Sequence, residues 1–187
     1  MEIETQTQVK QTTWTIDPTH SVIGFSDKHM LISTVHGRFT RFDAAVVFYP
    51  DSPETAQLEA KIDTTSVETG EPKRDEHLRS ADFFDSENYP HIIFRSKDLR
   101  RTSDERWKLT GDLSIRGTTH EIILDMEGFS EVVKDPWGNA RMGGTATATL
   151  NRFDYGLHFS GALETGGLVV GEKVKIQLDI ELMRPAD

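Results

Sequence analysis

Apolar and polar residues alternate along several stretches of this chain, which is the pattern of β-strands that bury one face. The clearest case is the run 173–182, whose apolar positions are Val174, Ile176, Leu178, Ile180 and Leu182. The same alternation occurs at 58–63, 107–115, 121–127 and 142–150. Together with the stretches 21–27, 42–49 and 92–96, the pattern predicts about eight strands.

Turn-forming residues separate these strands. Clusters of Pro, Gly, Asp, Ser and Thr occur at 49–54, 101–105, 116–120 and 135–139. Short connections between strands at this spacing favour an antiparallel meander that closes into a barrel or a sandwich. The chain has no internal repeat and no linker, so we expect a flexible tail at 1–13 and a single domain at 14–187.

One segment, 65–90, interrupts the alternation. Pro72 suits the first turn of a helix, and the acidic residues around it favour the positive end of the helix dipole. Leu78, Phe83 and Phe84 offer apolar contacts. The sequence therefore predicts a mostly helical insertion over about 70–88, which acts as a lid or a plug because structureless loops of this length are uncommon.

Composition excludes several classes of function. The net charge of -10 argues against binding to nucleic acid or to an anionic membrane surface, which both require a positive footprint. The absence of cysteine excludes disulfides, thiolate metal sites and a cysteine nucleophile. The polar N-terminal residues do not form a secretory signal, and no segment approaches a membrane span. We expect a cytoplasmic protein, or a periplasmic one if a leader has been trimmed.

The seven histidines are dispersed, although His20, His29 and His36 fall within seventeen residues. On strand parity His20 lies on the face opposite to His29, and no tight ligand pair such as H-E-x-x-H occurs. Hydrogen-bonding histidines at strand ends are favoured over a metal site. Neither a nucleophile elbow nor a phosphate-binding loop is present, so no catalytic residue and no metal ligand is assigned.

The inward faces of the predicted strands combine aromatic and small residues. The aromatic and large apolar positions are Phe25, Phe42, Phe48, Phe94, Trp107 and Met126. Small residues such as Ala44, Ala60 and Gly111 leave volume beside them. A barrel of about eight strands is either filled by side chains or holds one ligand, and the pattern leaves both alternatives open.

Several motifs give this chain a resemblance to the YceI-like, polyisoprenoid-binding family from about Trp14 to the C-terminus. They are WTIDPTHSVIGF at 14–25, KHM at 28–30, VHGRF at 35–39, TTSVET at 64–69, RDEHLRSADFF at 74–84, YPHIIFRS at 89–96, LTGDLSIRGTT at 109–119, DPWG at 135–138 and VGEKVKI at 170–176. The resemblance implies a lipocalin-like, eight-stranded antiparallel β-barrel with a short helical insertion.

The resemblance also implies a function. Members hold a long isoprenoid chain or another lipid inside the barrel, often form dimers and have no settled enzymatic activity. We therefore expect a protein that binds a polyprenyl phosphate, quinone-type or fatty-acid-like lipid for carriage, storage or sequestration. It would have no cofactor besides this lipid, no nucleic-acid partner, no stable membrane insertion, and a homodimeric state. The alternatives are a metal-dependent enzyme using His20, His29 and His77, and a packed barrel whose dimer surface is its function.

The predicted site has an apolar part and a polar part. The predicted cavity residues are Phe25, Asp27, His29, Phe42, Phe48, Leu78, Phe83, Phe84, Phe94, Trp107, Leu113 and Met126. The predicted head-group donors are His20, Arg38, Arg74, His77 and Arg79. Relatives usually carry an apolar residue at the position of Asp27, and a buried carboxylate is costly unless it is paired. Asp27 is therefore expected either to mark the wet mouth of the cavity or to pair with His29, Lys28 or an insertion arginine. We also expect that it selects a ligand with a polar or shorter end.

Overall fold

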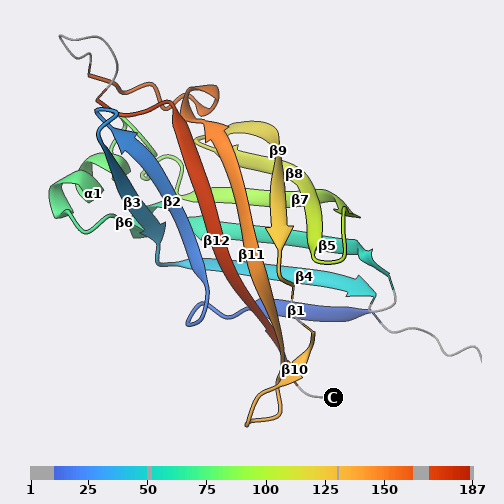
Figure 1. Cartoon of the computed structure of the whole chain (residues 1–187). Helices are drawn as coiled ribbons and strands as arrows, with labels where there is room; N and C mark the ends of the chain where they lie inside the picture. The colour runs from blue at the N-terminus through green and yellow to red at the C-terminus, as the bar shows by residue number, and fades with distance from the viewer. Residues whose placement is uncertain (1–10, 50–51, 130, 162–168, 186–187) are drawn as a thin grey trace, which may run out of the picture.

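The computed structural model describes residues 11–49, 52–129, 131–161 and 169–185 (Figure 1). Its strands are β1 (Thr12–Ile16), β2 (Val22–His29), β3 (Ser33–Phe39), β4 (Phe42–Tyr49), β5 (Ser52–Asp63), β6 (Val67–Glu68), β7 (His91–Arg101), β8 (Arg106–Ile115), β9 (Thr118–Glu127), β10 (Val133–Lys134), β11 (Ala140–Asn151) and β12 (Lys173–Arg184). The helical elements are α1 (Pro72–Arg79) and the 3₁₀ turns η1 (Thr64–Ser66) and η2 (Arg152–Tyr155).

Eight strands close into an antiparallel barrel. Following the pairings, the ring runs β1, β4, β5, β7, β8, β9, β11, β12 and back to β1. This confirms the predicted fold class. Closure matters for function because it encloses the inward faces of all the strands in one space.

The chain breaks between β1 and β2, between β3 and β4, and between β5 and β6, and the pieces outside the ring, β2, β3 and β6, extend its wall. β2 pairs with the first half of β12, whereas β1 pairs with its last residues. β3 pairs with β2, and β6 pairs with β3. The break between β1 and β2 is encoded locally: Pro18 has no N–H to donate, and the Asp17 carboxylate accepts from the Thr19 amide at 2.9 Å.

The start of the domain lies slightly earlier than predicted. β1 begins at Thr12, so two residues of the expected tail belong to the barrel, whereas residues 1–10 lie outside the described residues. The predicted strand at 21–27 is β2, and β1 precedes it in the wall. Tyr49 and Ser52 pair across the predicted turn at 49–54. Residues 50–51 of this turn lie outside the described residues.

The insertion is less helical than predicted. Glu71 caps α1 by accepting from the Lys73 amide, and Pro72 occupies the first turn as expected. The helix ends at Arg79 because the Ser80 hydroxyl donates to the His77 carbonyl at 2.7 Å and accepts from the Asp82 amide. The rest of the predicted 70–88 helix consists of turns, whose carbonyls at Ser80 and Asp85 accept from later amides.

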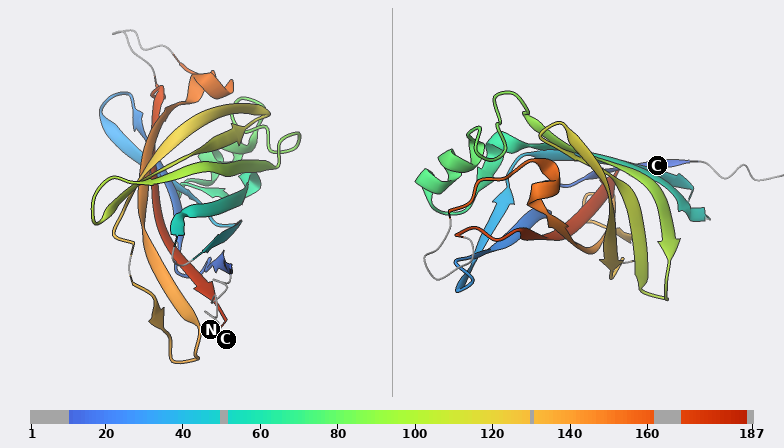
Figure 2. Two further views of the ribbon diagram at one scale, coloured as in Figure 1. Left: turned by 90° about the vertical axis from the view of Figure 1, so that its right-hand side faces the viewer. Right: turned by 90° about the horizontal axis from the view of Figure 1, so that it is seen from above.

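The ends of the barrel differ, as Figure 1 and Figure 2 show. α1, η2 and the β2–β3 turn lie at one end, and the hairpin formed by β10 and β11 projects at the opposite end. Among the described residues, no helix is both long and apolar enough to cross a membrane.

Candidate functional site: an apolar cavity with one polar end

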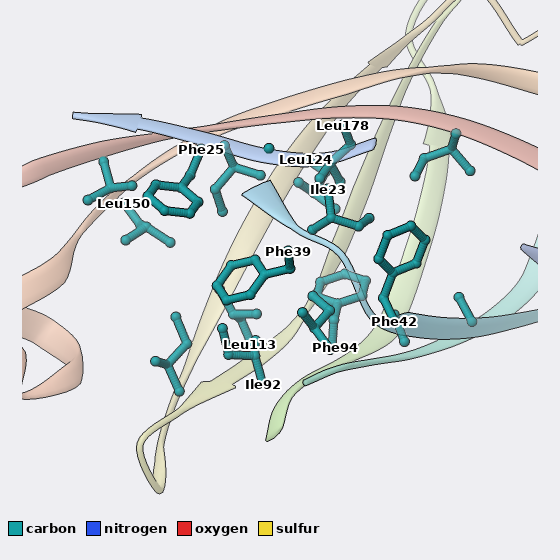
Figure 3. Close-up of a pocket in the computed structure, with 18 of the residues that line it drawn as sticks. Ile23, Phe25, Phe39, Phe42, Ile92, Phe94, Leu113, Leu124, Leu150 and Leu178 are labelled. Atoms are coloured by element: carbon teal, nitrogen blue, oxygen red, sulfur yellow. The ribbon is translucent and has the colours of Figure 1, made fainter. Parts of the chain in front are cut away.

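The barrel encloses a cavity of about 870 Å³, a size in the upper part of the range of roughly 300–1,000 Å³ that ligand sites usually have. Figure 3 shows side chains from opposite walls, including Phe25, Phe94 and Leu178, pointing into this space. The lining is overwhelmingly apolar. The alternation read from the sequence is the cause, because every second residue of each strand faces inward.

All twelve predicted cavity residues line this cavity: Phe25, Asp27, His29, Phe42, Phe48, Leu78, Phe83, Phe84, Phe94, Trp107, Leu113 and Met126. Nine come from strands of the wall, and Leu78 with the Phe83–Phe84 pair comes from the insertion. The insertion therefore contributes to the wall at one end. Their role in binding a ligand stays a prediction.

Small residues make room for the aromatic rings. Phe25 pairs with Gly37 across β2 and β3, and a Cβ at Gly37 would collide with the Phe25 ring. Ala44 pairs with Ala60 across β4 and β5, and both line the cavity. A side chain larger than a methyl group at either alanine would project into the space that the barrel leaves open.

Most of the polar lining gathers at the end near α1. Asp27, His29, Thr69, Arg74, His77 and Arg152 line this part of the cavity, which we call the mouth. Arg74 is held there because its side chain donates to the Thr69 hydroxyl at 2.7 Å and to the Thr69 carbonyl at 3.0 Å. The His77 ring lies edge-on to the rings of Phe83 and Phe159, with centroid distances of 5.1 and 4.6 Å.

Arg152 is a buried cation at the mouth, with only 4% of its surface exposed. Its guanidinium donates to the backbone carbonyls of Gly171 at 2.6 Å, Val170 at 3.1 Å and Leu157. Among the described residues it forms no ion pair with a carboxylate. Burial lowers the pKa of Arg152, and the charges of Asp27 and Glu172 oppose this shift.

Asp27 lines the mouth, which agrees with one of the two expectations for this residue, and the charge of Arg152 acts on it there. Burial raises the pKa of Asp27, and the Lys28 amide, which donates to Oδ1 at 2.6 Å, and the charge of Arg152 act against that rise. A Cβ at Gly171 would collide with the Asp27 carboxylate, so a glycine is needed there. Of the charges expected to pair with Asp27, that of His29 also lowers its pKa, but less than the charge of Arg152 does.

The five predicted head-group donors divide into two groups. Arg74 and His77 line the mouth. The other three bind elsewhere: His20 contacts the Asp17 carboxylate at 3.0 Å, Arg38 pairs with Glu68 at 2.9 Å, and Arg79 donates to the carbonyls of Thr65 and Val67. Arg79 thereby ties α1 to the wall. Hydrogen bonding within the fold therefore explains the side chains of these three residues without a ligand.

The sequence pattern does not indicate that Arg152 is a polar residue of the mouth. It follows the alternating run of β11 directly, within the polar stretch NRFDYG, which carries no periodic signal. Its carbonyl partners at 170–171 lie eighteen and nineteen residues further along the chain. The only local signal is the turn itself, in which the Asn151 side chain accepts from the Phe153 amide and Gly156 has a φ of +76°.

A cluster of charges lies on the outer face of the barrel. Arg141 binds Asp17 at 2.6 Å, Asp135 at 2.8 Å and also Glu181. Hydrogen bonds from His20 and Arg141 lower the pKa of Asp17. The pKa of Arg141 is raised because its guanidinium donates hydrogen bonds to the three carboxylates. Burial alone would raise the pKa of Asp135, but hydrogen bonds from Arg141 and Asn139 outweigh this effect and lower the pKa to about 2.

This cluster also contains the one group of possible metal ligands found in the described part of the chain. Asp17, His20 and Glu181 place one ligand atom each within 4.8 Å of one another. Arg141 already binds both carboxylates. His29 and His77 lie at the mouth instead, so the described structure does not bring together the three histidines of the metalloenzyme alternative.

Comparison with known proteins agrees with the motifs. The family model of the YceI-like domain matches residues 14–182. A UPF0312 protein of Staphylococcus aureus (strain N315) is 37% identical over 171 residues, which cover 91% of this chain and 96% of that protein. The solved structure of a Campylobacter jejuni YceI protein has a TM-score of 0.72 and 30% identity, covering 84% of this chain and 89% of that chain.

A more distant structure shares the fold. It is a polyisoprenoid-binding domain from Saccharophagus degradans implicated in plant cell wall breakdown, with a TM-score of 0.64 and 16% identity. The match covers 92% of this chain and 98% of that chain. At this identity the likeness concerns the arrangement of the backbone alone.

Proposed function

This chain belongs to the YceI-like family, and we propose that its barrel binds a long-chain isoprenoid or a similar amphiphilic lipid. The apolar tail occupies the cavity, and an oxygen-bearing head group, such as a phosphate, a quinone or a carboxylate, lies at the mouth. The purpose is carriage, storage or sequestration of the lipid. The description of the Saccharophagus degradans domain as polyisoprenoid-binding supports this choice of ligand class.

The observation that carries the proposal is the shape and chemistry of the cavity. It has a volume of about 870 Å³ and is almost wholly apolar, and most of its polar lining, including Arg74, His77 and Arg152, lies at one end. A polyprenyl tail gains roughly 0.8 kcal/mol for each CH₂ removed from water, so a chain of several units is retained without any chemical reaction. Arg74 provides N–H donors for the head group. His77 lies beside it with its Nε2 atom bound to the Asp82 carboxylate at 2.8 Å, and the Arg152 charge favours an acceptor that is negative or strongly polar.

The direct test is extraction of freshly purified protein with organic solvent, followed by mass spectrometry of the extract. The proposal predicts about one lipid per chain, with the masses of a C5-repeat series or of a fatty-acid-like amphiphile. Elemental analysis of the same preparation tests the metalloenzyme alternative, which requires a stoichiometric metal.

A matched pair of variants localises the lipid. Ala60→Trp fills the space opposite Ala44, and we expect the extracted lipid to fall by at least about fivefold because the bulky ring occupies the path of the tail. Ala45 lies next to Ala44 on the exposed face, so Ala45→Trp serves as the control and should retain the lipid. Equal lipid content in the two variants would place the lipid outside the barrel and refute the proposal.

A further inference from the structure

The turn that joins β2 to β3 exposes three consecutive apolar residues at the rim of the mouth. Leu31 is 69% exposed, Ile32 is 81% exposed, and Met30 is also exposed. We call Met30, Leu31 and Ile32 the rim tip. Exposed apolar side chains are common singly, but three together at the end of a hairpin form a compact hydrophobic protrusion.

The backbone of the rim tip gives no reason for these residue types. Met30 has a φ of +53° and Leu31 a φ of +61°, in the left-handed region where glycine and asparagine are favoured. The side chains of Leu31 and Ile32 point mostly to solvent, so packing within this chain does not explain them either. Large apolar residues at strained, exposed positions indicate contact with something outside the chain.

The rim tip is continuous with the cavity. His29, directly before it, lines the mouth and bridges to Val170. The Met30 amide donates to the carbonyl of Val169, which is itself a lining residue, at 3.0 Å. The Val169 amide in turn donates to the Gly161 carbonyl, and Phe159, two residues before Gly161, lines the cavity and is 38% exposed.

The hairpin segment that carries the rim tip lacks the negative charge of the chain as a whole, and this favours contact with a membrane surface. No aspartate or glutamate occurs from Lys28 to Phe42, although the chain has 31 acidic residues. Lys28 is exposed and donates to the Thr34 hydroxyl beside the turn. Asp27, the nearest carboxylate in the hairpin, lines the cavity.

We propose that the rim tip inserts into the interfacial region of a lipid bilayer and thereby holds the mouth of the cavity against the membrane. Apolar side chains that enter the boundary between head groups and acyl chains, with a cation beside them, are a sufficient anchor for reversible binding. A lipid tail then passes between bilayer and barrel with little exposure to water. The role in loading rests on the proposed function, but docking on the bilayer does not require a lipid in the cavity.

The test compares two double variants of the full-length protein after lipid has been stripped from it. Leu31→Asn with Ile32→Ser removes the apolar rim tip, and asparagine tolerates the left-handed backbone. Val132→Asn with Val133→Ser is the control, because Val132 and Val133 are 55% and 58% exposed in the hairpin at the opposite end. The unfolding midpoint of each variant is measured first.

Binding is measured by co-sedimentation with vesicles of phosphatidylcholine, whose zwitterionic surface does not repel the negatively charged chain. The wild type should sediment with the vesicles, the rim-tip variant should lose about tenfold in partition, and the control should match the wild type. In addition, the emission of Leu31→Trp should shift to the blue when vesicles are added. Failure of the wild type to bind, or equal binding of the two double variants, would overturn the inference.

The two proposals fail in different ways. If solvent extraction yields no lipid but the rim tip still binds vesicles, the proposed cargo is wrong and the docking surface stands. If lipid is extracted but the wild type ignores vesicles, the cargo stands and the docking surface is wrong.

Discussion

The protein contains two largely buried arginines whose surroundings differ. Arg141, on the outer face, is bound by three carboxylates from Asp17, Asp135 and Glu181. Arg152, at the mouth, is held by three backbone carbonyls and faces the cavity. The three hydrogen-bonding partners of Arg141 are negative, whereas those of Arg152 are neutral carbonyls, and the charges of Asp27 and Glu172 act on Arg152 without an ion pair among the described residues.

This difference separates a structural ion cluster from a candidate binding group. The Arg141 cluster joins the β1–β2 break, the turn before β11 and the end of β12, so its charges are satisfied within the fold. Arg152 also ties two segments together, since its carbonyl partners belong to the chain on either side of the mouth. Because its charge is only weakly compensated, an acceptor group of a ligand gains more beside Arg152 than beside Arg141.

The largest effect is expected for Arg141→Met. Removal of the guanidinium leaves three carboxylates close together without a counter-charge, and we expect the unfolding midpoint to fall by roughly 5–10 °C. Lipid content of the folded protein should not change. The control is Arg106→Met, which breaks an exposed pair with Glu127 and should shift the midpoint by only about 1–2 °C. Similar shifts for both variants would show that the cluster is not structural.

A smaller loss of stability but a larger loss of lipid is expected for Arg152→Met. The carbonyls of Leu157, Val170 and Gly171 lose their donor, which should lower the midpoint by roughly 3–6 °C. Extracted lipid per folded chain should fall as well, because the mouth loses its buried cation. A reduced lipid content in Arg141→Met but not in Arg152→Met would contradict the assignment of Arg141 as structural and of Arg152 as part of the binding site.

The smallest effect concerns Asp27 and depends on pH. Its pKa is raised in the folded protein, so its contribution to stability is present below the unfolded value of 3.8 and is lost as pH rises through the folded value. Asp27→Asn should therefore raise the unfolding midpoint at neutral pH, and the gain should vanish in acid.

Asp17 should behave in the opposite way. Its pKa is lowered, so its stabilisation is present above 3.8 and is lost as pH falls through the folded value. Asp17→Asn should lower the midpoint at neutral pH, and thermal unfolding across the pH range measures both variants. If the change in midpoint caused by Asp27→Asn varied with pH in the same direction as that caused by Asp17→Asn, the raised pKa of Asp27 would be wrong.

The sequence predicts the cavity well because its lining depends on a local rule. Alternation places Phe25, Phe94 and Leu113 inward once the strands exist, and barrel closure brings them together. The alternation does not indicate β3 and β6. β6 has only two residues, and β3 has three inward positions, Val35, Gly37 and Phe39, of which the middle one is a glycine.

The polar part of the site could not be predicted in the same way. Arg141 meets Asp17 across 124 positions, and Arg152 contacts carbonyls whose position depends on the path of the chain before β12. No periodic pattern encodes such contacts. Arg38 and Arg79 carry the right chemistry for a head group, but the fold commits them to Glu68 and to backbone carbonyls. The homodimer and the cytoplasmic location stay predictions.

The central claim is that a lipid lies in the barrel with its head group at the mouth. The most direct test is photo-crosslinking with an isoprenoid that carries a diazirine on its head group, followed by peptide mapping. The account predicts adducts in the segments 27–29, 69–77 and 152–159, which surround the mouth. Adducts at the opposite end of the lining, around Pro53, Arg101 and Trp107, would contradict it.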